Sequence, residues 1–147
     1  MPADRQYCTF YLDDIFFGVE VENVQEVVCY QEMTRVPLAP PVVRGLINLR
    51  GQIVTALELR RRLEMPERPA GRNPVNVVVR ADDVPTSLLV DQIGDVLEVP
   101  DEAFERPPET LQGVGRELIR GAYKLKDRLL LILDMEKVVS VSGEAGV

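Results

Sequence analysis

The stretch VRGLINLRGQIVTALELRRRL, residues 43–63, decides the architecture because the chain contains a second version of it. Residues 119–139 read IRGAYKLKDRLLLILDMEKVV and align with the first version without a gap, so that Arg44-Gly45 falls on Arg120-Gly121. In both versions two apolar runs flank a polar turn, which is the pattern of a β-hairpin. Because an arginine stands at this position in both versions, we expect Arg44 and Arg120 to share a structural role. An internal duplication therefore organises this chain.

The repeat extends into the first part of each half. Residues 13–28 (DDIFFGVEVENVQEVV) align with residues 82–97 (DDVPTSLLVDQIGDVL), again without a gap. The offset is 69 here and 76 between the hairpins, so the second half carries extra residues, which we expect within residues 101–115.

Local patterns predict mostly strands, because short runs rich in β-branched and aromatic residues alternate with turn signals. The expected strands are residues 7–12, 15–20, 46–49 and 52–57 in the first half and 75–80, 86–90, 118–125 and 128–133 in the second. Valines three residues apart from Val21 to Val27, and their counterparts from Val90 to Val96, predict one or two helical turns. Short amphipathic helices are expected at residues 59–63 and 135–139.

Several short strands in each unit predict a mainly β protein built from two small barrels. We place the units at residues 6–63 and 75–139, joined by the proline-rich linker 64–74 and followed by a tail at 140–147. A barrel of about 60 residues is marginally stable alone because it buries little apolar surface. We therefore expect the units to pack together, exchange strands and form a single domain over residues 1–147.

The composition limits the chemistry. The 147 residues include 17 basic and 24 acidic side chains, and the net charge of −7 disfavours nucleic-acid binding, which needs excess Lys and Arg. We interpret the one basic run, residues 60–62, as a solvated helix face. There is no histidine, and we interpret Cys8 and Cys29 as small buried apolar residues, so no structural zinc site or His-dependent catalytic centre is expected. We expect no metal and no cofactor.

The sequence also bears on localisation. It begins without the pattern of a secretory signal, and its longest apolar runs are far shorter than the roughly 20 residues of a membrane span. We therefore expect a cytoplasmic protein that does not insert directly into the membrane.

Two alternative functions draw on parts of the sequence. Paired aspartates in both halves, Asp13-Asp14 and Asp82-Asp83, would suit the two-carboxylate dyad of an enzyme. An aspartic protease needs Asp-Thr/Ser-Gly, whereas Ile15-Phe16 and Val84-Pro85 follow these pairs, and Asp-Asp between strands is ordinary turn chemistry. The other alternative is a small-barrel module that binds an unrelated peptide or nucleic acid, and the acidic charge disfavours the nucleic acid.

Three segments together resemble the CheW family, the adaptors of bacterial chemosensory arrays. VPLAPPVVRGLINLRGQIVTALELRRRL, residues 36–63, contains the family pattern Pro-x-x-Pro followed by R-G-x-x-N-L-R-G, and LLVDQIGDVLEVP (88–100) and the second hairpin extend the match. The resemblance covers about residues 6–139. It implies two intertwined, five-stranded SH3-like β-barrels, in agreement with the duplication.

The resemblance also implies the function. It predicts a non-catalytic scaffold that couples the cytoplasmic hairpin of methyl-accepting chemoreceptors to the regulatory domain of a CheA-type histidine kinase. Two residues depart from the family pattern, since Thr55 stands where proline is frequent and Glu58 where aspartate is frequent. The chain can therefore be the principal adaptor of its cell or a paralogue that serves a non-flagellar chemosensory pathway.

Arg50 is the main receptor-binding candidate. Arg50 can be only a solvated residue of the hairpin turn, in which Gly51 supplies the positive φ, or it can make bidentate hydrogen bonds to a partner. The resemblance favours the second interpretation and implies a groove with an apolar floor and a polar rim for the receptor hairpin. The receptor-binding candidates are Arg50, Glu26, Val24, Asn48, Gly45, Ile93 and Val75. Of these, Asn48 is expected to orient the turn.

Some candidates have a plain structural alternative. For Val24 and Ile93 taken singly, core packing is the favoured interpretation. The resemblance places the kinase-binding surface at Glu32, Met33 and Thr34. An exposed Met33 would suit an adaptable interface, whereas a buried one would be part of the core.

Overall fold

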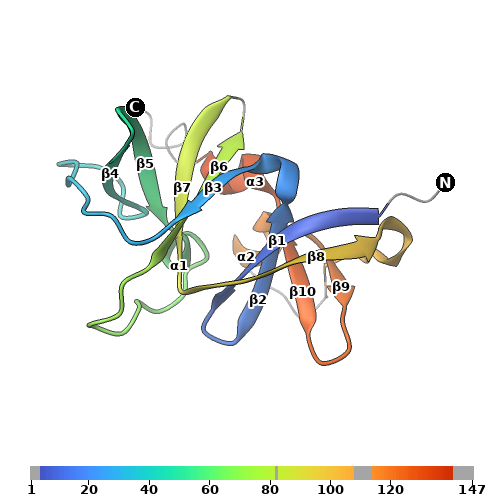
Figure 1. Ribbon diagram of the computed structural model, residues 1–147. Helices are drawn as coiled ribbons and strands as arrows, with labels where there is room; N and C mark the ends of the chain where they lie inside the picture. Colours follow the sequence, from blue (N-terminus) through green and yellow to red (C-terminus); the bar gives the residue numbers. More distant parts are fainter. Residues whose placement is uncertain (1–3, 82, 108–113, 141–147) are drawn as a thin grey trace.

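The computed structural model describes residues 4–81, 83–107 and 114–140 and contains two five-stranded sheets. The strands are β1 (Asp4–Leu12), β2 (Ile15–Glu20), β3 (Val24–Val28), β4 (Val43–Leu49), β5 (Gln52–Glu58), β6 (Val75–Ala81), β7 (Val84–Val90), β8 (Gln92–Pro100), β9 (Ile119–Lys124) and β10 (Leu129–Leu133). The helices are η1 (Val21–Asn23), α1 (Leu59–Arg62), η2 (Asp101–Ala103), α2 (Val114–Leu118) and α3 (Met135–Val139). The strand order is β8-β1-β2-β10-β9 in the sheet called A and β3-β6-β7-β5-β4 in the sheet called B (Figure 1).

Each sheet takes strands from both halves of the sequence. Sheet A combines β1 and β2 of the first half with β8, β9 and β10 of the second, and sheet B combines β3, β4 and β5 with β6 and β7. By the sequence repeat, the first five strands correspond in order to the last five. The two sheets therefore have the same strand order with the halves exchanged, which confirms the intertwined fold.

The chain changes sheets at two repeat-related points, which Figure 1 shows as the crossings between the two sides of the molecule. Helix η1 leads from β2 in sheet A to β3 in sheet B, and Asp91 leads from β7 in sheet B to β8 in sheet A. Within each sheet one parallel pair joins the halves, β2 with β10 and β5 with β7. In the described part of the chain the edge strands of a sheet do not pair with each other.

The helical turns expected at residues 21–27 and 90–96 are largely wrong. Of these residues only Val21–Asn23 are helical, and strands occupy the rest apart from Asp91. The pairing of β3 with β6 shifts register between Val24 and Glu26, and the pairing of β8 with β1 shifts at the corresponding place. A bulge adds one residue to the two-residue period of a strand, so apolar residues three apart look helical in the sequence.

The two hairpins end the halves with turns at matching positions. In the first, Leu49 pairs with Gln52, which leaves a two-residue turn, as expected. In the second, β9 ends at Lys124 and β10 begins at Leu129, so the strands are shorter than expected, but the Leu125 N–H donates to the Arg128 carbonyl at 2.8 Å across Lys126 and Asp127. Helices α1 and α3 follow as predicted, and the linker 64–74 contains neither helix nor strand.

The main core lies between the two sheets. Its largest cluster contains Phe10 and Leu131 from sheet A, Val77 and Leu88 from sheet B, and Leu59 from α1. Strand β10 (Leu129–Leu133) is buried on both faces, because alternate residues belong to two different clusters. This explains why its sequence, LLLIL, shows no alternation.

Candidate partner-binding surfaces

The turn between β4 and β5 holds Arg50 in an unusual backbone conformation. Arg50 has a φ of 52° and Gly51 a φ of 87°, the combination that two-residue type I′ hairpin turns require. The backbone N–H of Gly51 donates to Asn48 Oδ1 at 2.9 Å, so Asn48 orients the turn. Asn and Gly are the residues that suit such turns, and the turn itself gives no reason for an arginine.

The Arg50 side chain joins the two edges of sheet B. Its guanidinium donates to Glu26 Oε2, and this ion pair links the β4–β5 turn to β3, the strand at the opposite edge of the sheet. The hydrogen bond from Arg50, followed by one from Gln25, lowers the pKa of Glu26 below its ordinary value. Arg50 remains 74% exposed and Glu26 only 19%. A guanidinium has five N–H donors, so Arg50 keeps donors available to a partner.

The three apolar receptor candidates lie where the sheets meet. Val24 is on β3, Val75 on β6 and Ile93 on β8, and each is half-buried against the main core. They are therefore neither fully buried nor free of the core. The structure also corrects the expectation that Val24 and Glu26 lie on a helix, because both are on β3.

Gly45 is buried, and its role in any site is indirect. The segment before β4 crosses over it, with Thr34 paired to Leu46 by backbone hydrogen bonds of 2.8 and 2.9 Å. A Cβ on Gly45 would lie 2.7 Å from the Thr34 carbonyl oxygen and 3.0 Å from Met33 Cβ. The repeat-related Gly121 is crossed in the same way, which gives both Arg-Gly pairs a structural reason for their glycine.

The same crossing segment contains the kinase-binding candidates. Glu32 and Thr34 are exposed, whereas Met33 is half-buried and packs against the cluster around Ile47 and Leu49. The sequence allows Met33 to be either an exposed interface residue or a buried core residue, and its burial lies between the two.

The basic run at residues 60–62 is not a solvated face, and that interpretation is wrong. Arg60 is 3% exposed, with its guanidinium donating to Asp13 Oδ1 at 2.6 Å and to Asp91 Oδ1 at 2.9 Å. Arg62 donates to two backbone carbonyls at the end of α3. Only the middle arginine is exposed.

A second buried arginine completes this network. Arg68 of the linker donates to both carboxylate oxygens of Glu58, at 2.8 and 3.1 Å, and to Asp91 at 2.9 Å. Burial alone would raise the pKa of Asp91, but hydrogen bonds from Arg60, the Asp13 backbone N–H and Arg68 together outweigh it and lower the pKa to about 2. Sequence reasoning missed this network because its members lie far apart in the chain and no local pattern pairs them.

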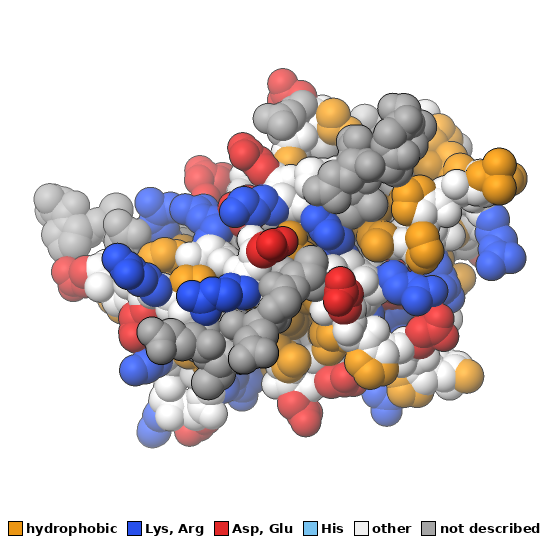
Figure 2. All heavy atoms as spheres, turned by 180° about the vertical axis from the view of Figure 1, so that it is seen from behind, with side chains coloured by type: hydrophobic (Ala, Val, Ile, Leu, Met, Phe, Trp, Pro, Cys, Tyr) orange, Lys and Arg blue, Asp and Glu red, His pale blue; other side chains and the backbone are white. Residues whose placement is uncertain are grey.

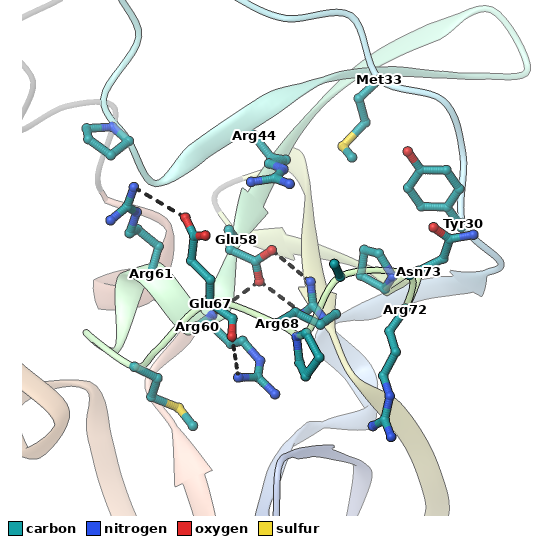
Figure 3. Close-up of a pocket in the computed structure, with 16 residues that line it drawn as sticks. Tyr30, Met33, Arg44, Glu58, Arg60, Arg61, Glu67, Arg68, Arg72 and Asn73 are labelled. Atoms are coloured by element: carbon teal, nitrogen blue, oxygen red, sulfur yellow. Dashed lines mark hydrogen bonds and ion pairs between the residues drawn. The ribbon is translucent and has the colours of Figure 1, made fainter.

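The two repeat-related arginines have different surroundings, contrary to the shared role expected for them. Arg120 forms an ion pair with Glu20 at 3.1 Å. Arg44 is exposed, has no side-chain partner in the described part of the chain, and points into a cavity between the linker and the segment before β4 (Figure 3).

The cysteines also differ from the expectation that both are buried. Cys29 is exposed and Cys8 is half-buried, and neither forms a disulfide. Burial raises the pKa of the Cys8 thiol above its ordinary value.

The duplicated, intertwined sheets define a class of small β proteins, and comparisons identify the family. A profile of the CheW-like domain matches residues 6–142. The chemotaxis protein CheW of Treponema pallidum is 30% identical over 92% of this chain and 82% of that protein, and that of Bacillus subtilis is 31% identical over 95% and 89%. The crystal structure of the scaffolding protein TtCheW from Thermoanaerobacter tengcongensis matches with a TM-score of 0.85 and 25% identity, over 97% of this chain and 96% of that one. This chain belongs to the CheW-like family.

Proposed function

We propose that this chain is a non-catalytic adaptor of a chemosensory pathway, which couples the cytoplasmic hairpin of chemoreceptors to the regulatory domain of a CheA-type histidine kinase. The observation that carries the proposal is Arg50. A non-glycine residue in the left-handed region costs about 1 kcal/mol or more, yet an exposed arginine occupies it at a rigid turn. Membership of a family whose relatives are named chemotaxis proteins supports these partners.

We assign the receptor to the side of sheet B that carries the ion pair. Arg50, Glu26 and Asn48 form the polar rim in this proposal, and the half-buried Val24, Val75 and Ile93 supply the apolar floor. Gly45 contributes by keeping the crossing segment close to β4. A bidentate guanidinium suits a carboxylate or backbone carbonyls on the receptor hairpin.

We assign the kinase to Glu32, Met33 and Thr34, on the segment that crosses Gly45. Two exposed polar side chains beside a half-buried methionine suit an interface of moderate affinity. The adaptor would act in the cytoplasm at the receptor tips. No helix in the described ranges is long and apolar enough to cross a membrane.

Separate affinity measurements test the proposal, with a soluble receptor hairpin fragment and with the kinase regulatory domain. The double variant Glu32→Lys/Thr34→Lys changes only exposed side chains and should weaken kinase binding about tenfold, or about 1.4 kcal/mol, while receptor binding stays within twofold. Glu136→Lys, an exposed change on α3, serves as the control. Equal loss of both partners at an unchanged melting temperature would contradict this partition, and failure of the unaltered chain to bind either partner would overturn the adaptor function.

A further inference from the structure

Two cavities meet beside the segment that precedes β4. The smaller, of about 230 Å³, lies between this segment and the linker, and the larger, of about 760 Å³, follows the segment itself. Both are lined by Tyr30, Met33, Pro41 and Arg44. The two cavities therefore adjoin, and we call them together the arginine groove.

One half of the groove is basic. The smaller cavity is lined by the arginines Arg44, Arg60, Arg61, Arg68 and Arg72 and by the glutamates Glu58 and Glu67. The buried network uses Arg60 and Arg68. Of the others, Arg61 is 4.0 Å from Glu67, and Arg44 and Arg72 have no side-chain partner among the residues described. Three exposed arginines thus line this cavity in a chain whose net charge is −7, with the Arg61 and Arg72 side chains on opposite sides of it (Figure 3).

A comparison of the two halves shows that Arg44 lacks the partner that its counterpart has. In the second half, Arg120 corresponds to Arg44 and is neutralised by Glu20 at the edge of a separate cavity of about 350 Å³. Around Arg44, the repeat places Leu89, on β7 of the second half, at the position of Glu20, and Leu89 is fully buried in the core. Arg44 therefore lacks the carboxylate that its counterpart has, and a carboxylate from another molecule would take that place.

The other half of the groove has more apolar residues, although Arg35 and Arg44 also line it. Val36, Pro37, Leu38 and Pro40 line the larger cavity together with Tyr30. Leu38 is fully exposed and has a φ of 65°, so it contributes nothing to the core and occupies a region unfavourable for leucine. Figure 2 shows hydrophobic and basic side chains interspersed on the side of the molecule that sheet B forms. A small anion would cover only the basic half.

We propose that the arginine groove binds an extended acidic segment of a partner protein. Its carboxylates would pair with Arg44, Arg61 and Arg72, because planar guanidinium groups bind carboxylates bidentately. An apolar side chain of the same segment would cover Leu38. The groove touches the proposed kinase surface at Met33, but the inference does not depend on the adaptor function, because it rests on side chains outside both assigned surfaces.

A labelled peptide tests the groove directly. Fluorescence anisotropy with the full chain should show saturable binding of fluorescein-Gly-Asp-Leu-Asp-Leu-Asp-Gly. Arg44→Ala and Arg72→Ala should each weaken binding about fivefold to tenfold, as expected for the loss of a charge-assisted hydrogen bond. Arg120→Ala is the matched control and should change affinity less than about twofold, because that arginine is paired within the chain. Replacing Asp by Lys in the peptide should abolish binding, and replacing Leu by Ser should weaken it.

Several outcomes would overturn the proposal. Absence of saturable binding, unchanged affinity in Arg44→Ala, or an equal loss in Arg120→Ala would show that the groove does not select acidic segments. Two results together would identify a small-anion pocket instead. Inorganic phosphate would displace the peptide with an affinity equal to that of the peptide, and the Leu-to-Ser change would have no effect. Circular dichroism checks that each variant is folded, and Arg44→Gln replaces Arg44→Ala if the latter unfolds. Amide NMR shifts on peptide addition should map to residues 30–44 and 65–74.

Discussion

The two hairpins that end the halves share a sequence pattern but use their cations differently. In the first, Arg50 lies in a two-residue turn and remains largely exposed beside Glu26. In the second, Arg128, which follows the turn, lies over the rings of Tyr11 and Phe16, with its Cζ 5.7 and 5.0 Å from the ring centroids. One hairpin therefore stabilises the protein itself, and the other leaves its cation available to a partner.

In the proposed function, this difference separates a hairpin that stabilises the fold from one that recognises a partner. Within the two hairpins, the apolar strand residues and the crossed glycines keep their residue type, because packing demands it. The hairpin turns and the helices that follow them diverge. Lys126, at the position of Arg50, forms no ion pair in the ranges that the structure describes. Repeat-related positions thus provide matched controls for one another.

The largest expected effect comes from separating the halves. Residues 1–63 expressed alone should show no cooperative unfolding, because β1 and β2 belong to sheet A whereas β3, β4 and β5 belong to sheet B. Unpaired strand edges and exposed apolar surface would remain. Thermal melting followed by circular dichroism, with the full chain as the control, measures this. A sharp, reversible melt of the fragment would show that the halves are independent units.

The next effect concerns α1 and α3. Arg60→Ala should lower the free energy of unfolding by about 3 kcal/mol, because it removes a buried guanidinium from the mostly buried Asp91 carboxylate, which keeps only Arg68, and from the exposed Asp13. Glu136→Ala, at the corresponding position of α3, should change it by less than about 0.5 kcal/mol because Glu136 is exposed. Urea unfolding measures both. Equal effects would mean that the buried network contributes no more than an ordinary surface charge.

The acid sensitivity of the two crossings should also differ. The pKa of Asp91 is lowered from 3.8 to about 2 in the folded chain, so its stabilising contribution is complete above about pH 4 and is lost as the pH falls toward 2. The shift corresponds to about 2 kcal/mol. Asp91→Asn should remove this part of the pH dependence, whereas Glu22→Gln, at the matching crossing, should leave it in place. Unfolding curves between pH 2 and pH 6 measure the difference, and identical curves for Asp91→Asn and the unaltered chain would contradict it.

Changes in the two hairpin turns should have the smallest effect on stability. At Arg50 they should nevertheless have a clear effect on binding. Arg50→Ala should change the free energy of unfolding by less than about 0.5 kcal/mol and weaken binding of the receptor hairpin by about 2 kcal/mol, some thirtyfold. Lysine at this position should restore little, because an ammonium lacks the planar fork. Arg50→Gly should leave the turn at least as stable, since glycine adopts positive φ freely.

The control for this prediction is Lys126→Ala, in the turn of the second hairpin. It should leave receptor affinity within about twofold, because that residue lies outside the proposed rim. Titration calorimetry with the receptor fragment, beside melting curves, measures all four variants. Unchanged affinity in Arg50→Ala, or an equal loss in Lys126→Ala, would return Arg50 to plain turn chemistry.

Much of the fold was predictable because the information is local. Apolar runs, turn residues and the gapless repeat identified all of the strands except β3 and β8, together with the short helices α1 and α3 and the intertwining. The bulges at β3 and β8 misled the prediction, because an extra residue in a strand imitates the helical spacing. Of the candidate site, Arg50 and the orienting role of Asn48 were predictable from the turn, whereas the ion pair with Glu26 joins two edges of a sheet and has no local signature.

By itself, the sequence determined the duplication, the strand content and the two-residue turn, because each depends on residues that are neighbours in the chain. The tertiary structure alone decided the environment of every arginine. Arg60 is buried because the second crossing brings Asp91 against α1, Arg120 is paired because β2 lies near β9, and Arg44 is left facing a cavity. Charges interact through space, and their partners come from segments that only the exchange of strands brings together.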